Sequence, residues 1–191
     1  MAGSGKGGKN KPVVERIDMT ITSHRPAKDE YAEFYETYVR LVPDADLRDI
    51  LSQQMDVIQA ELNPIDEPTA SMIHPPYTWT IKQVVGHLID CERVFADRLH
   101  RFACGDEQPL PGIDQDQYVA NQDFETVGLA ELTTELLHLR QANLLLLRRI
   151  PDEAWDRRGT ASDVSFTVRS LACIMAGHII HHIKIIKSRV A

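Results

Sequence analysis

Residues 79–105, WTIKQVVGHLIDCERVFADRLHRFACG, decide the fold because they carry the start signal, the apolar stripe and the stop signal of one long helix. Thr80 and Gln83 have the spacing of a capping box, in which two side chains satisfy free N–H groups at a helix start. Gly105 is the residue type that most often follows the last helical turn. The sequence therefore predicts a helix over residues 81–103.

Three further segments, at about 46–62, 126–150 and 168–187, repeat apolar residues at helical spacing. The hydroxyl of Thr167 can cap the last of them. A shorter helix is expected earlier in the chain, over about 29–41, and strand signals are almost absent. Four long helices around one core, with a short leading helix on the N-terminal side, define an all-α four-helix bundle.

Composition limits the functions that this chain can have. Its 191 residues are 43% hydrophobic, which suffices for one core. A formal charge of -7, without a basic cluster in the body of the chain, argues against a nucleic acid as partner. Cys91, Cys104 and Cys173 form no CxxC pair, as expected in a reducing compartment. No apolar run is long enough for a membrane span, so we expect a soluble, cytoplasmic protein.

The beginning of the chain differs in composition from the rest. Its first dozen residues, MAGSGKGGKNKP, are rich in glycine and lysine and offer almost nothing to bury. Ordering them would cost backbone entropy without compensation. We expect a flexible tail over residues 1–24 and the helical domain over 25–191; a basic arm that touches a partner is the alternative interpretation of the tail.

Three histidines occupy positions that should face the core. His178 and His182 lie four residues apart, and therefore on one helix face, within an apolar arc. His87 lies in the apolar stripe of the helix at 81–103. A buried polar group without a partner costs about 2 to 7 kcal/mol. A carbonyl or hydroxyl could satisfy each ring separately, but one shared cation would satisfy all three.

Three stretches, spanning nearly the whole chain after the tail, resemble the DinB/YfiT-like superfamily. They are YETYVRLVPDADL, WTIKQVVGHLIDCERVFADRLHRFACGDEQPLPGIDQDQYV and TVRSLACIMAGHIIHH. The combination of GHLIDCER with the terminal GHxxHH carries the resemblance. It implies a DinB-like four-helix bundle in which His87, His178 and His182 bind one divalent transition metal, with zinc or nickel preferred.

Other side chains near these motifs have two interpretations each. Asp90 could orient a ligand in the second shell or form a surface ion pair. Cys91 could be a soft fourth ligand or a small core residue. His181 could ligate the metal or face solvent. Asp114 and Asp116 belong either to a turn near the pocket or to a substrate contact. The catalytic residues themselves stay unknown at this point.

Three neutral imidazoles leave a divalent ion with its full charge and an open coordination position, which is typical of catalytic sites. The resemblance implies a metal-dependent enzyme, either a hydrolase or a thiol S-transferase, acting on a small molecule. A low-molecular-weight thiol is the second reactant of the transferase. The alternative is a non-enzymatic metal-binding bundle in stress response or regulation. The leucine run at 144–147 also favours a homodimer.

Overall fold

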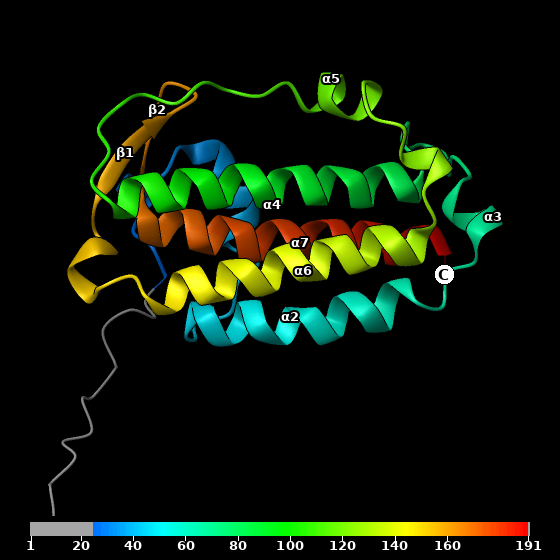
Figure 1. The fold of residues 1–191 in the computed structure, drawn as a ribbon, viewed down its shortest axis with the longest axis horizontal. Coiled ribbons are helices and arrows are strands. Elements are labelled where there is room, and N and C mark those ends of the chain that lie inside the picture. Colours follow the sequence, from blue (N-terminus) through cyan, green and yellow to red (C-terminus); the bar gives the residue numbers. More distant parts are fainter. Residues whose placement is uncertain (1–24, 191) are drawn as a thin grey trace, which may run out of the picture.

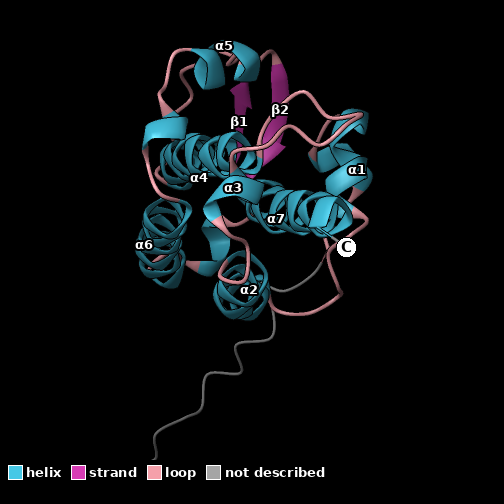
Figure 2. Ribbon diagram, turned by 90° about the vertical axis from the view of Figure 1, so that its right-hand side faces the viewer, coloured by secondary structure: helices cyan, strands magenta, loops and turns pink. Residues whose placement is uncertain are grey.

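The computed structural model describes residues 25–190, in which four long helices form a bundle (Figure 1). They are α2 (Leu47–Leu62), α4 (Ile81–Ala103), α6 (Leu129–Arg148) and α7 (Val168–Val190). α4 and α2 each pack against both α6 and α7, so α4 lies diagonally opposite α2 (Figure 2). The predicted all-α four-helix bundle is confirmed, and the structure adds the order of the helices around the core.

The capping residues fix the helix starts as the sequence predicts. Thr80 Oγ1 accepts a hydrogen bond from the Gln83 N–H, while Gln83 Oε1 accepts one from the Thr80 N–H. At the start of α7, the hydroxyl of Thr167 accepts a hydrogen bond from the Ser170 N–H. Gly105 follows α4 with a φ of 78°, in the left-handed region. Both helices that carry the histidines therefore begin at the residues that the sequence predicts.

The leading segment differs from the single helix expected over 29–41. Only α1 (Glu36–Val39) is α-helical, and two 3₁₀ turns precede it. These turns are Lys28–Glu30 and Glu33–Tyr35. Glu30 is buried and its carboxylate accepts hydrogen bonds from Ala27 N–H and Thr167 Oγ1. The bond from Thr167, together with one from Ser170 Oγ to the Glu30 carbonyl oxygen, holds this turn against the start of α7.

A two-stranded antiparallel hairpin, β1 (Arg158–Ala161) and β2 (Val164–Thr167), precedes α7. The sequence did not predict this hairpin, because each strand has only four residues and gives no periodic signal. Ser162 and Asp163 form the turn with φ values of 53° and 61°. A two-residue turn of this kind matches the twist of the flanking strands. The hairpin leads the chain directly into α7.

Short helices occupy the connections between the long ones. α3 (Glu67–Ala70) follows α2, and α5 (Gln115–Ala120) lies beyond α4 on the outside of the bundle (Figure 1). Asp114 caps α5 by accepting hydrogen bonds from the N–H groups of Asp116 and Gln117. Two 3₁₀ turns complete the set, at Phe124–Thr126 and Asp152–Ala154. The connection between α4 and α6 therefore contains an ordered helix that packs beside α4.

Two further expectations from the sequence concern the N-terminal tail and membrane spans. The tail predicted over residues 1–24 lies outside the described residues. None of the helices within residues 25–190 is long and apolar enough to cross a membrane.

Candidate metal centre

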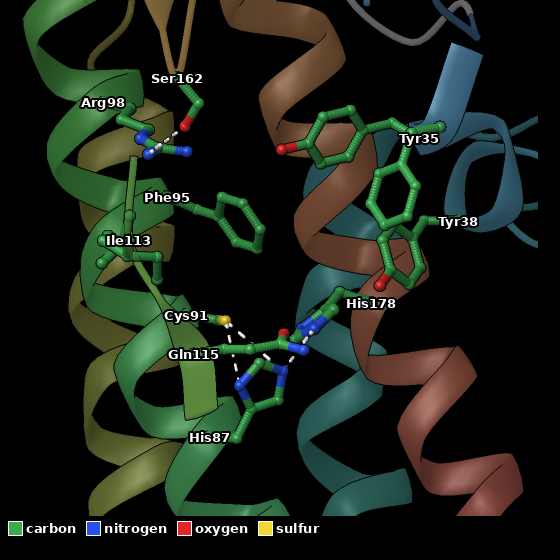
Figure 3. Close-up of a pocket in the computed structure, with 12 residues that line it drawn as sticks. Tyr35, Tyr38, His87, Cys91, Phe95, Arg98, Ile113, Gln115, Ser162 and His178 are labelled. Atoms are coloured by element: carbon green, nitrogen blue, oxygen red, sulfur yellow. Dashed lines mark hydrogen bonds between the residues drawn. The ribbon is translucent and has the colours of Figure 1, made fainter. Parts of the chain in front are cut away.

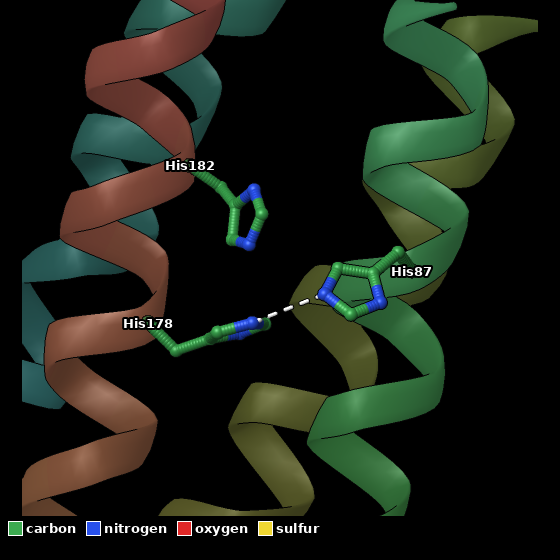
Figure 4. Close-up of side chains that lie close together, drawn as sticks. All are labelled: His87, His178 and His182. Atoms are coloured by element: carbon green, nitrogen blue, oxygen red, sulfur yellow. Dashed lines mark hydrogen bonds between the residues drawn. The ribbon is translucent and has the colours of Figure 1, made fainter. Parts of the chain in front are cut away.

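His87 on α4 and the pair His178 and His182 on α7 point toward one another inside the bundle (Figure 4). One ligand nitrogen from each ring lies within 4.8 Å of the other two. The Nε2 atoms of His87 and His178 are 3.1 Å apart. Two nitrogens on one tetrahedral zinc ion, each about 2.05 Å from it, would be about 3.3 Å apart. The separation of His87 and His178 thus fits two ligands of one ion, and a nitrogen of His182 lies near enough to be the third.

Burial keeps the three imidazoles neutral. It lowers the pKa of His87 to about 4 and that of His182 to about 3, and the neighbouring His87 adds to the second shift. The pKa of His178 falls well below its usual value, because the ring is buried beside two other imidazoles. A neutral imidazole has a free lone pair, which is the form that binds a metal. At pH 7 the cluster therefore presents nitrogen donors to a cation.

Each histidine motif begins with a glycine that lets another segment come close. A Cβ on Gly177 would lie 2.3 Å from the carbonyl oxygen of Tyr38, so α7 approaches the backbone of α1 directly. A Cβ on Gly86 would lie 2.5 Å from the far end of the Phe124 ring. The glycine in each Gly–His pair thus has a packing role, and the histidine that follows it points into the bundle.

Aromatic rings hold the imidazoles in place. The ring of Tyr38 meets His178 edge-on with centroids 5.2 Å apart, and Phe95 does the same at 5.7 Å. Trp79 packs against His87 with centroids 5.3 Å apart. These ring contacts restrict the orientation of the imidazoles and supply no hydrogen bond to the ring nitrogens.

Two cavities meet at the histidine cluster. The first, of about 260 Å³, is lined by His87 and His178 and extends away from them along α4 (Figure 3). The second, of about 330 Å³, is lined by His182 on the opposite side of the cluster. Gln115, at the start of α5, lines both cavities. The cluster therefore borders both cavities.

The acidic candidates lie in different places. Asp116 lines the second cavity, and its charge partly offsets the fall in the pKa of His87. Asp114 serves as the cap of α5. Asp90 is buried, which raises its pKa, and it accepts a 2.6 Å hydrogen bond from Gln122 Nε2. The guanidinium of Arg93 lies 3.9 Å from the Asp90 carboxylate. That Asp90 orients a metal ligand stays a prediction.

Cys91 and His181 lie beside the cluster but do not belong to it. Cys91 Sγ is 3.7 Å from both ring nitrogens of His87, and burial raises the pKa of its thiol to about 12. His181 packs edge-on against Tyr38 and lines a separate surface cavity. Among the described residues, the group that can share one ion is the one formed by His87, His178 and His182.

Sequence reasoning missed several residues that line the first cavity, notably Tyr35, Phe95 and Arg98. A helical signal for Arg98 exists, because eleven residues correspond to about 20° of rotation relative to His87. Tyr35 comes from the leading segment, which folds back over α7 and whose position no local pattern indicates. Only the tertiary arrangement brings these side chains to one cavity.

A helical bundle that gathers three histidines at the meeting point of two cavities defines a candidate metal-binding protein. A profile of the DinB superfamily matches residues 38–186, and the chain belongs to this superfamily. No protein with a curated description matches the chain in sequence.

Two solved structures resemble the chain. YfiT from Bacillus subtilis, described as a probable metal-dependent hydrolase with an unusual four-helix bundle topology, matches with a TM-score of 0.68 at 19% identity. The match covers 74% of this chain and 82% of YfiT. A mycothiol-dependent maleylpyruvate isomerase matches with a TM-score of 0.61 at 14% identity, over 75% of this chain and 60% of the isomerase. At these identities, the likeness establishes the fold.

Proposed function

We propose that this protein is a metal-dependent enzyme that transfers a low-molecular-weight thiol to a small electrophile. The observation that carries the proposal is the position of the histidine cluster, whose donors converge where two cavities meet. His87, His178 and His182 are the proposed ligands, and zinc or nickel suits nitrogen donors better than magnesium or calcium does. A site reached from two sides suits a reaction of two molecules.

The charge of such a site favours a thiolate nucleophile. A divalent ion held by His87, His178 and His182 would keep its full charge, so it would stabilise a thiol as thiolate and lower the pKa of a water molecule at the site. The protein's own residues keep the donors neutral by burial, and Tyr38 and Phe95 pack edge-on against His178. These features support activation of an anionic sulfur at neutral pH.

The nucleophilic thiol has to come from outside the protein. Burial raises the pKa of both Cys91 and Cys173 to about 12, so both thiols stay protonated at neutral pH. Cys104 is exposed at the end of α4 and does not line either cavity. A free low-molecular-weight thiol can reach the cluster through the cavities. The mycothiol dependence stated for the isomerase of similar fold supports this choice.

Hydrolysis is the second candidate function, and Asp116 favours it. Its carboxylate lines the cavity beside His182 and acts electrostatically on His87. A carboxylate near a bound water can accept the proton that is lost when water attacks a substrate. The description of YfiT as a probable metal-dependent hydrolase supports the same reaction class.

Metal analysis tests the first step of the proposal. We expect about one divalent transition ion per chain after native purification, measured by elemental analysis. His87→Ala, His178→Ala and His182→Ala should each abolish tight binding while the helical circular dichroism remains. His181→Ala is the matched control and should keep the metal, because His181 lies outside the cluster. No metal in the natural protein, and none bound on titration, would refute the site.

Turnover then separates the two reactions. With 4-chloro-3-nitrobenzamide and a small thiol, transfer forms a carbon–sulfur bond, releases chloride and gives the thiol proton to solvent. We expect metal-dependent chloride release only when thiol is present, and none with His87→Ala. Metal-dependent cleavage of esters without thiol would support the hydrolase instead. If neither activity is found over a broad panel of substrates, the non-enzymatic bundle in stress response or regulation would be favoured.

The cytoplasmic location and the homodimer stay predictions.

A further inference from the structure

The first cavity contains a buried positive charge that forms no ion pair with any carboxylate of residues 25–190. Arg98 on α4 is 4% exposed. Its Nη2 donates hydrogen bonds to the carbonyl oxygen of Pro111 at 3.0 Å and to Ser162 Oγ at 3.2 Å, and both acceptors are uncharged. Within residues 25–190, no carboxylate forms an ion pair with Arg98. Burying an arginine without an anion is costly, so its position needs an explanation.

Arg140, also buried within residues 25–190, shows how a buried arginine is usually neutralised. Arg140 is 0% exposed and forms a bidentate ion pair with Glu92 at 2.7 and 2.9 Å. In the core of the bundle, the buried guanidinium of Arg140 is thus neutralised by a carboxylate. Arg98 differs because its surroundings are a cavity, into which an external anion can enter.

Arg98 shares the cavity with the proposed metal ligands. It lies eleven residues after His87 on the same helix, which places it on nearly the same face and about 16 Å further along the axis. Cys91 and Phe95 line the wall between them. Figure 3 shows His87 and His178 at one end of this cavity and Arg98 with Ser162 at the other.

The walls between the two ends are aromatic. Tyr38 and Phe95 line the cavity, and the Tyr35 hydroxyl points toward the Arg98 end (Figure 3). A guanidinium binds a carboxylate through two parallel hydrogen bonds, and aromatic walls suit a flat apolar body. The volume of about 260 Å³ admits only a small molecule. The cavity therefore fits a small, flat carboxylic acid whose reactive end reaches the histidines.

We propose that Arg98 is a specificity-determining residue that binds the carboxylate of one reactant while the other end of that reactant lies at the histidine cluster. The assignment of the reactive end rests on the proposed function. The carboxylate could belong to the electrophile or to the thiol. Both sources share the same recognition chemistry, and the aromatic walls favour the electrophile.

Binding measurements test the anion site without relying on turnover. The probes are 4-phenylbutyrate and its uncharged analogue 4-phenylbutan-1-ol, titrated by calorimetry into the purified full-length protein. A charge-assisted hydrogen bond predicts that the acid binds at least about tenfold more tightly than the alcohol. Arg98→Met should remove this preference, and Arg98→Lys should keep part of it. Arg101→Met is the control, because Arg101 pairs with Asp106 outside the cavity.

A carboxylate could also bind at the metal, and the His87→Ala variant separates these two sites. We expect the preference for the acid to persist in His87→Ala and to disappear in Arg98→Met. If Arg98 only ties the Pro111 carbonyl and Ser162 to α4, its replacement would leave the preference unchanged. That result, or a preference lost in His87→Ala but kept in Arg98→Met, would overturn the proposal.

Turnover by the metal-loaded enzyme identifies which reactant carries the carboxylate. The matched electrophiles are 4-chloro-3-nitrobenzoate and 4-chloro-3-nitrobenzamide, and the matched thiols are mercaptoacetate and 2-mercaptoethanol. Arg98→Met should lower kcat/KM for the benzoate about tenfold or more relative to its effect on the benzamide. The same loss confined to mercaptoacetate would assign the site to the thiol. Loss of neither, in an active enzyme, would overturn the anion site and leave thiol transfer intact. If the protein instead prefers the acid in calorimetry but catalyses no thiol transfer, the anion site would stand and the proposed function would be wrong.

Discussion

The three cysteines show how burial alone separates identical side chains. Cys91 and Cys173 are buried, and this raises the pKa of each thiol to about 12, whereas Cys104 is exposed at the end of α4. Only the thiolate reacts with a disulfide reagent, so a raised pKa slows labelling at pH 8. We expect a chromogenic disulfide reagent to label Cys104 quickly and the other two only after unfolding.

The control for this prediction is Cys104→Ser. In the folded variant, labelling at pH 8 should fall almost to zero, while denaturant should still reveal two thiols. Rapid reaction of a second thiol in the folded variant would show that Cys91 or Cys173 is more accessible and more acidic than its burial indicates. It would also reopen Cys91, which lines the cavity, as a nucleophile or ligand.

At the level of helices, the contact between α1 and α7 depends on the lack of a side chain at Gly177. A Cβ there would lie 2.3 Å from the carbonyl oxygen of Tyr38, and backbone cannot rotate away as a side chain can. Inserting a methyl group into a packed interface costs about 1 to 3 kcal/mol. We expect Gly177→Ala to lower the free energy of unfolding in urea by about that amount and to weaken metal binding, because Tyr38 packs against His178.

Gly86→Ala is the matched variant, since Gly86 also precedes a histidine within a long helix. Its added Cβ would meet the far end of the Phe124 ring, which is a side chain and can shift. Replacing a helical glycine by alanine also gains up to about 1 kcal/mol. We expect Gly86→Ala to be the milder change. Equal effects of both substitutions would show that the α1 backbone adapts as readily as the Phe124 side chain.

Across the whole molecule, one buried polar network joins all four long helices. Arg140 of α6 forms the ion pair with Glu92 of α4 and donates a 2.8 Å hydrogen bond to Gln54 Oε1 of α2. Gln54 Nε2 in turn donates to the carbonyl oxygen of Ala176 on α7, also at 2.8 Å. The amide of Asn143 donates to Glu92. This network fixes α7 two residues before the first of its clustered histidines.

Removing one partner of this network should be more damaging than removing both. Arg140→Met leaves Glu92 as a buried charge without its cation, which costs about 3 to 5 kcal/mol. The double variant Glu92→Leu, Arg140→Met replaces the pair by apolar groups and should recover most of that loss. Urea denaturation with an unchanged m-value measures both. A double variant as unstable as Arg140→Met would show that the network contributes through its remaining amide contacts and not through the ion pair.

Local signals predicted the long helices and the inward face of the histidines. The capping box at Thr80, the glycine at 105 and the hydroxyl of Thr167 each act within one turn of the chain, so sequence spacing suffices to find them. The four-residue spacing of His178 and His182 places both on one face for the same reason. The DinB-like bundle expected from the GHLIDCER and GHxxHH motifs is confirmed by the family match over residues 38–186.

The sequence by itself determined the helical class, the bounds of α4 and the shared face of the α7 histidines, because these depend on contacts within about one helical turn. The tertiary structure decided what lies opposite that face. Packing α4 against α7 brings His87 to its partners, and folding the leading segment over α7 brings Tyr38 to His178. The β hairpin places Ser162 beside Arg98. Each of these contacts joins segments far apart in sequence, so its geometry depends on the whole bundle and is not encoded in local spacing.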